Sequence, residues 1–128
     1  MAQNTLAAIL TAAMLATAGA AQAQPNQPLF LFIYSPGPAW KPGVPAGQQA
    51  LAPHGKYMAS LAADGRLVAG GPLLDADGGM AILHAADAEA ARAILAADPA
   101  VKAGIMKAEI HGWSPQFGSN DPLLPKAH

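Results

Sequence analysis

The hydrophobic pattern between residues 29 and 113 predicts six elements in the order strand, helix, strand, strand, helix, strand. Residues 29–34 form an unbroken apolar run, typical of a strand that is covered on both faces. Residues 66–72 and 80–85 predict two further strands, and the Gly78-Gly79 pair between them indicates a hairpin turn. Residues 105–113 alternate between apolar and polar side chains, as a half-buried strand does.

Two segments have helical spacing. The first is residues 48–64, at least from Pro53 onward, and it places Leu51, His54, Met58 and Leu61 on one stripe. The second is residues 88–97, which follow Asp87 as a candidate N-cap and end at Asp98, because a residue before proline is pushed out of the α region. Residues 35–47 contain four prolines and are predicted to form an ordered loop.

This order predicts an α+β fold of the ferredoxin-like βαββαβ type, with a four-stranded antiparallel sheet and two helices on one face. In that topology the start of the first helix and the end of the second helix meet at one edge of the sheet. We therefore expect His54 and Asp98 to lie at the same end of the domain. The loop with Trp40 and the hairpin with Asp75 reach that end too, so we expect a pocket there.

The chain has three predicted regions. Residues 1–23 resemble a secretory signal, because residues 6–18 are uncharged and mostly apolar and Ala21-Gln22-Ala23 fits a small-x-small cleavage site. The first four residues carry no Lys or Arg, which departs from that pattern, and the apolar run is too short for a stable membrane span. We expect a periplasmic or secreted protein with a domain at 24–113 and a Pro-containing tail at 114–128.

Charge, cysteine content and histidine spacing limit the kinds of partner and ligand that we expect. The formal charge is −1 with no basic patch, so we expect no nucleic-acid partner. There are no cysteines, and a small exported domain without disulfides needs a well-filled core or a partner subunit. Because two helices cover only one face of the sheet while the first strand is apolar on both, we expect a homodimer. His84, His111 and His128 lack metal-ligand spacing, so we expect no metal site.

Several of these residues have two interpretations. His54 on an apolar stripe is either a packed histidine with one hydrogen-bond partner or a general base, kept neutral by the positive end of its helix. Asp98 either caps a short turn at residues 99–103, or pairs with that base, or does both. Trp40 is a packing plug or a surface for ligand stacking. Asp75 has the sequence context of a turn residue.

The same segments resemble the YCII-related (YciI-like) family of the dimeric α+β barrel superfamily. The matching stretches are Pro53-His54-Gly-Lys-Tyr-Met, Gly65-Arg66-Leu-Val-Ala-Gly-Gly-Pro72, Leu73-Leu74-Asp75 and Asp98-Pro99. The resemblance implies a subunit that pairs sheet to sheet with a twin, and it implies that His54 and Asp98 correspond to the family's proposed catalytic pair. We expect a substrate-binding surface around this pair, formed by Trp40, Tyr57, Gly71, Pro72 and Asp75.

These features are compatible with three functions, of which the third involves no ligand. The first is a cofactor-independent lyase or isomerase in which a His-Asp pair performs acid-base chemistry on a small molecule, with aromatic compounds among the candidates. The alternative is a non-catalytic periplasmic module, either a small-ligand-binding or an accessory dimer, that uses the same pocket. The third is a structural dimer. Two titratable groups on inward faces favour the enzyme, because a binding module does not need both.

Overall fold

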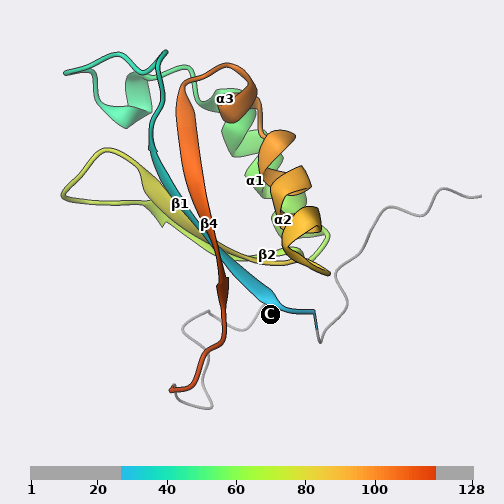
Figure 1. The fold of residues 1–128 in the computed structure, drawn as a ribbon. Helices are drawn as coiled ribbons and strands as arrows, with labels where there is room; N and C mark the ends of the chain where they lie inside the picture. The colour runs from blue at the N-terminus through green and yellow to red at the C-terminus, as the bar shows by residue number, and fades with distance from the viewer. Residues whose placement is uncertain (1–26, 118–128) are drawn as a thin grey trace, which may run out of the picture.

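The computed structural model describes residues 27–117, so the predicted signal segment and most of the predicted tail lie outside the described residues. The domain has the predicted alternation of strands and helices (Figure 1). Its elements are β1 (Leu29–Pro36), η1 (Ala46–Gln48), α1 (Ala52–Ala63), β2 (Leu67–Pro72), β3 (Gly79–His84), α2 (Ala88–Ala96), α3 (Pro99–Lys102) and β4 (Met106–Trp113).

The four strands form one antiparallel sheet in the order β2-β3-β1-β4, and the helices lie together on one side of it (Figure 1). The predicted ferredoxin-like α+β fold is confirmed. β1 occupies a central position and pairs with both β3 and β4, in agreement with its apolar sequence. Within residues 27–117, none of the helices has the length and hydrophobicity of a membrane span.

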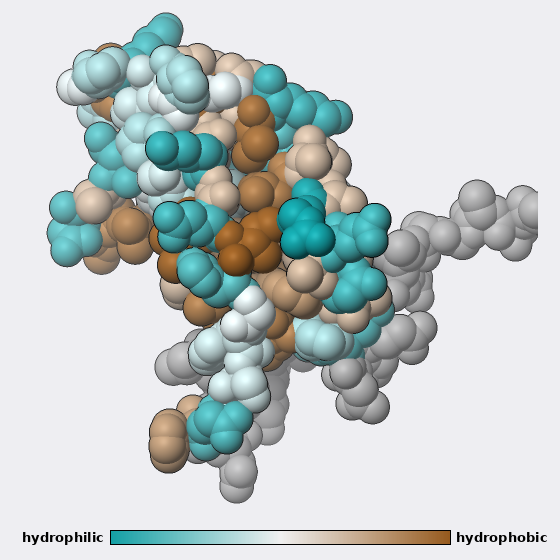
Figure 2. Space-filling view, in the orientation of Figure 1, coloured by the Kyte–Doolittle hydropathy of each residue, from teal (hydrophilic) through white to brown (hydrophobic). Residues whose placement is uncertain are grey.

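The two faces of the sheet differ in cover. Phe30, Phe32 and Tyr34 point to the helices and are buried with Leu61 and Leu83 in the core. The opposite face carries Leu29, Leu31 and Ile33 of β1 beside Met80, Ile82 and Trp113, and three of these side chains are about two-fifths exposed, namely Ile33 (39%), Met80 (43%) and Trp113 (38%). Figure 2 shows apolar residues gathered in the middle of the molecule and hydrophilic residues around them.

The first helix begins later than the 48–64 segment suggested. Residues 46–48 form the short 3₁₀ turn η1, and α1 starts at Ala52 with Pro53 in its first turn. Proline has no N–H to donate and its ring would clash with the carbonyl four residues earlier, so α-helix cannot continue upstream of this point. The turn expected at residues 99–103 is the short helix α3, capped by Asp98.

Candidate functional site

Asp98 is the centre of a buried hydrogen-bond network. Its side chain has no exposed surface. One carboxylate oxygen, Oδ1, accepts from the Ala100 N–H at 2.9 Å, which caps α3. The other, Oδ2, accepts from the Tyr34 hydroxyl at 3.1 Å, and the His54 ring lies with Nδ1 at 2.9 Å from Oδ1 and 2.8 Å from Oδ2. Asp98 therefore caps a helix and pairs with a histidine at the same time.

His54 is presented to Asp98 by the first turn of α1. An ionised carboxylate only accepts hydrogen bonds, so Nδ1 carries the proton that it donates to Asp98. In the neutral ring this leaves Nε2 with a free lone pair, and no residue between 27 and 117 makes a hydrogen bond to it. The His54 side chain is 19% exposed, so Nε2 is available to a ligand as a proton acceptor.

Tyr34 is the member of this network that the sequence analysis missed. It ends the inward face of β1 after Phe30 and Phe32, and its ring packs edge to face with the His54 ring at 5.5 Å between centroids. Burial, together with the charge of Asp98, raises the pKa of the Tyr34 hydroxyl above its ordinary value. Tyr34 therefore stays protonated and donates to Asp98. A hydroxyl at the end of an otherwise aromatic and aliphatic stripe was the signal in the sequence.

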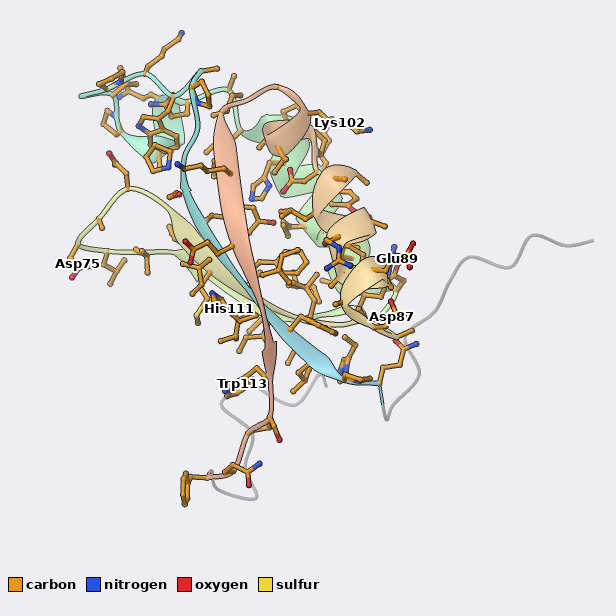
Figure 3. The ribbon with its side chains drawn as sticks, viewed as in Figure 1. Asp75, Asp87, Glu89, Lys102, His111 and Trp113 are labelled. Atoms are coloured by element: carbon orange, nitrogen blue, oxygen red, sulfur yellow. The ribbon has the colours of Figure 1, made fainter. Side chains whose placement is uncertain are left out.

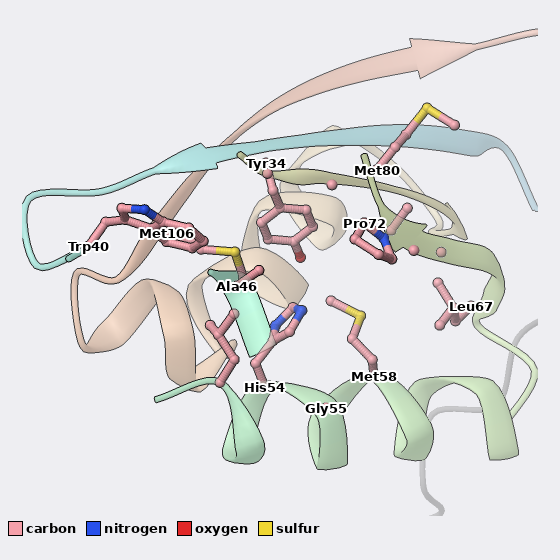
Figure 4. Close-up of a pocket in the computed structure, with 16 residues that line it drawn as sticks. Tyr34, Trp40, Ala46, His54, Gly55, Met58, Leu67, Pro72, Met80 and Met106 are labelled. Atoms are coloured by element: carbon pink, nitrogen blue, oxygen red, sulfur yellow. The ribbon is translucent and has the colours of Figure 1, made fainter. Parts of the chain in front are cut away.

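A cavity of about 260 Å³ opens beside this network, between the helix layer and the β2–β3 end of the sheet. In Figure 4, Tyr34 reaches down from β1 and His54 reaches up from α1, with Met58 beside them and Trp40 and Leu67 at opposite ends. Apart from His54 and the Tyr34 hydroxyl, the lining side chains are mostly aliphatic, aromatic or thioether: Trp40, Ala46, Leu51, Met58, Leu67, Pro72, Ala81 and Met106. The imidazole of His54 thus faces a cavity whose other lining side chains are mostly apolar.

The structure brings some of the expected substrate-binding residues together and leaves others apart. Trp40, Gly71 and Pro72 line the cavity. Tyr57 does not, because its hydroxyl donates to the Ile94 carbonyl at 2.7 Å and the ring lies beside α2. Asp75 does not either: it is exposed in the β2–β3 hairpin and extends away from the helices (Figure 3). The hairpin reaches the cavity through its base, at Gly78 and Gly79, and not through its tip.

The other described histidines lie elsewhere. His84 Nδ1 is 3.0 Å from the Gln27 carbonyl oxygen, and His111 Nε2 is 3.4 Å from Glu109, where both side chains are exposed on β4. Within residues 27–117 no three His, Cys, Asp or Glu side chains gather as metal ligands. At the cavity, the His54 ring, paired with the buried Asp98 carboxylate, is a group that can take part in proton transfer.

Comparisons with known proteins identify the family and a similar fold. The model of the YCII-related domain matches residues 29–114. A solved structure of 5-chloro-2-hydroxyhydroquinone dehydrochlorinase from Burkholderia phenoliruptrix AC1100, in complex with 2,5-dihydroxybenzoquinone, is similar with a TM-score of 0.52 and 25% sequence identity. The similarity covers 67% of this chain and 93% of that one. No curated protein matches the sequence.

Proposed function

The chain belongs to the YCII-related domain family, and on that premise we propose that it is a cofactor-independent lyase or isomerase acting on a small cyclic molecule. The observation that carries the proposal is the pairing of His54 Nδ1 with the buried Asp98 carboxylate, which leaves Nε2 free beside an apolar cavity. The similar structure is named as a dehydrochlorinase, an enzyme that removes a proton and a chloride ion.

In the proposed reaction His54 Nε2 takes a proton from a carbon or hydroxyl group of the substrate. The electron pair left behind either shifts a double bond, with the proton returned at another carbon, or expels a leaving group that departs with its bonding electrons. Asp98 stabilises the imidazolium formed in this step, because its carboxylate already accepts the Nδ1 proton. Tyr34 and Ala100 hold the carboxylate in place.

The size and lining of the cavity support a small, flat, weakly polar substrate. Its volume of about 260 Å³ is below the range of about 300–1,000 Å³ that is common for drug-sized ligands. One aromatic or quinonoid ring fits these properties, and we propose hydroxylated or halogenated hydroquinones and their quinones as the substrate class. The ligand of the similar structure, 2,5-dihydroxybenzoquinone, belongs to this class and is a suitable probe.

The decisive experiment compares His54→Ala with His84→Ala, since His84 does not line the cavity. Turnover of 5-chloro-2-hydroxyhydroquinone is followed by chloride release, and binding of 2,5-dihydroxybenzoquinone by calorimetry. We expect His54→Ala to lower kcat/KM by about 10²–10⁴-fold, the usual contribution of a general base, and His84→Ala to leave it unchanged. A parent protein that binds the quinone tightly but turns over no hydroquinone would instead be a binding module.

We also propose that the protein is a homodimer that buries the open face of its sheet. The support is the exposed apolar set on that face, which includes Ile33, Met80 and Trp113. A contact between identical faces would cover both copies at once. Sedimentation of the parent and of Ile33→Glu tests this: we expect a dimer for the parent and a monomer for the variant. A monomeric parent at micromolar concentration would refute the proposal.

Export to the periplasm or the medium remains a proposal as well. It is supported by the apolar segment and the Ala21-Gln22-Ala23 site, both of which lie outside the described residues. N-terminal sequencing of the protein recovered from cell fractions tests it. We expect a chain that begins at Gln24 in the envelope fraction or the medium, and recovery of the intact chain from the cytosol would contradict export.

A further inference from the structure

Gln49 is a buried polar residue that does not belong to the His54–Asp98 network. It is 8% exposed, and its side-chain amide makes three hydrogen bonds, all to the backbone of the preceding loop. Oε1 accepts from the Lys41 N–H at 3.1 Å, while Nε2 donates to the carbonyls of Lys41 at 2.8 Å and Val44 at 2.9 Å. Both backbone groups of Lys41 are therefore paired by one side chain, much as a neighbouring strand would pair them.

This amide fixes the loop on one side of Trp40, and a second contact fixes it on the other side. The Ala39 N–H donates to the Gly104 carbonyl at 2.8 Å. Next to it, Gly37 approaches the same carbonyl so closely that a Cβ atom would lie 2.3 Å from its oxygen. Trp40 is thus held between an anchor on the α3–β4 connection and the anchor at Gln49.

Within residues 27–117, the Trp40 indole makes no hydrogen bond. It is 7% exposed, it lines the cavity, and its Nε1 is a buried donor without a hydrogen-bond partner in the part of the chain that the structure describes. Figure 4 shows the indole at one end of the cavity next to Met106. The orientation of the ring therefore depends on packing and on the backbone that carries it, and Gln49 holds that backbone.

We infer that Gln49 is a positioning residue whose side-chain amide holds Trp40 in place, and that Trp40 is the face on which a flat substrate ring stacks. An electron-rich indole suits an electron-poor quinone ring, and stacking on a fixed indole costs little ordering on binding. The stacking half of this inference rests on the proposed function. The positioning half concerns the ligand-free protein and is testable without any substrate.

The first experiment uses the Trp113→Phe background, in which Trp40 is the remaining tryptophan of the two in the sequence. In this background Gln49→Met keeps the volume and removes the hydrogen bonds. Gln48→Met is the matched control, because Gln48 is exposed and its side chain makes no hydrogen bond within residues 27–117. We expect Gln49→Met to shift Trp40 emission to longer wavelength and to raise acrylamide quenching about twofold or more, with Gln48→Met unchanged. Equal quenching in all three proteins would overturn the positioning role.

The second experiment measures binding of 2,5-dihydroxybenzoquinone and steady-state turnover by the same variants with Trp113 restored. We expect Gln49→Met to raise the Kd and the KM about 3- to 10-fold while kcat changes by less than about twofold, since stacking contributes to binding and not to proton transfer. A loosened indole with unchanged Kd would overturn the stacking role. If the parent does not bind the quinone, the proposed function fails and the stacking role with it, whereas the acrylamide result still decides the positioning role.

Circular dichroism at each step confirms that the variants are folded. Should Gln49→Met not fold, Gln49→Glu replaces it, because the carboxylate still accepts from Lys41 N–H but has no donor for the two carbonyls. We expect acrylamide quenching of Gln49→Glu to exceed that of the parent, and quenching equal to the parent would overturn the positioning role.

Discussion

Within residues 27–117, two aspartate side chains cap the N-terminus of a helix, and only one of them belongs to the site. Asp87 begins α2 by accepting from the Ala90 N–H at 2.8 Å, and its side chain is exposed to solvent (Figure 3). Asp98 begins α3 by accepting from the Ala100 N–H at 2.9 Å, and its side chain is completely buried. The local structural task is the same, since both satisfy a free N–H in the first turn of a helix.

The difference lies in what else each carboxylate accepts. Asp87 makes no second side-chain hydrogen bond among residues 27–117, whereas Asp98 also accepts from Tyr34 and His54. A cap alone does not require burial, and burying a charge is costly unless it is paired and hydrogen-bonded. The extra partners of Asp98 offset that cost, and one of them is a titratable ring beside a cavity. Function is therefore indicated by the additional partners of Asp98 and not by its capping role.

The largest expected difference is in turnover, between Asp98→Asn and Asp87→Asn. Asparagine caps nearly as well as aspartate, so both helices should remain. At position 98, however, an NH₂ group facing His54 makes Nδ1 an acceptor, which moves the ring proton to Nε2 and removes the base. We expect a loss of about 10²–10³-fold in kcat/KM for Asp98→Asn and none for Asp87→Asn. Nitrogen-15 chemical shifts of His54 report the tautomer, and an unchanged tautomer with full activity would contradict the proposed role.

Alanine substitutions at Asp98 and Asp87 should also differ in their effect on the free energy of unfolding. Asp98→Ala removes the cap and leaves the Tyr34 hydroxyl and a backbone N–H buried without a partner, so we expect a loss of about 2–4 kcal/mol in the free energy of unfolding. Asp87→Ala removes one exposed cap and should cost about 1 kcal/mol. Urea denaturation of both variants checks this. Equal losses would mean that the buried network contributes nothing to stability beyond the cap.

Tyr34→Phe removes one donor from Asp98 and keeps the aromatic volume. We expect it to cost about 1 kcal/mol in stability near neutral pH. Because the pKa of Tyr34 is raised in the folded state, its contribution is present below the ordinary tyrosine pKa of about 10 and is lost as the pH rises above it. The stability difference between parent and variant should therefore shrink above pH 10. A difference that grows with alkaline pH would show that the hydroxyl does not donate to Asp98.

We expect the smallest effect at the ion pair between Asp64 and Arg66, which lies outside the buried Asp98 network. Asp64 pairs with Arg66 at 2.7 Å, and hydrogen bonding by the guanidinium lowers the pKa of Asp64. This stabilisation is present above the ordinary aspartate pKa of about 4 and is lost as the pH falls through the lowered value. We expect Arg66→Gln to cost at most about 0.5 kcal/mol at pH 7 and nothing near pH 2, as measured by thermal unfolding. A loss of unfolding free energy as large as that of Asp98→Ala would show that the surface and buried carboxylates do not differ in their contribution to stability.

The sequence was sufficient for the fold because hydrophobic periodicity and the order of elements leave few arrangements. An antiparallel chain order fixes which helix ends meet, so the approach of His54 to Asp98 was predictable without any knowledge of distances. The alternation along residues 105–113 likewise predicted a half-buried strand, and in β4 the side chains of Met106, Ala108 and Ile110 pack on the core. The double role of Asp98 was also open to prediction, since a cap uses only part of a carboxylate's accepting capacity.

The positions of other side chains could not be predicted from the sequence pattern, because they depend on the course of the loops and on helix rotation. Gln49 lay inside a segment with helical spacing, and only the break before Pro53 turns its side chain back to the loop. Asp75 was expected at the pocket because its hairpin reaches that edge, but the turn extends the tip beyond it. Tyr57 lies one position before Met58, which is enough to rotate it to a different face of α1 and to α2. The position of each of these side chains depends on how its helix is rotated or how far its loop extends, and hydrophobic periodicity specifies neither.

The separation of the site residues along the chain has a consequence for when the chemistry can begin. Asp98 is 44 residues from His54 and 64 residues from Tyr34, so β1, α1 and the start of α3 must all dock before the network exists. A nascent or truncated chain that lacks residue 98 carries the histidine without the carboxylate that orients it. Contacts of such long sequence separation form slowly, because closing the intervening chain costs conformational entropy. The proposed base is therefore assembled by folding itself, and we expect partly folded molecules to be inactive in the proposed reaction.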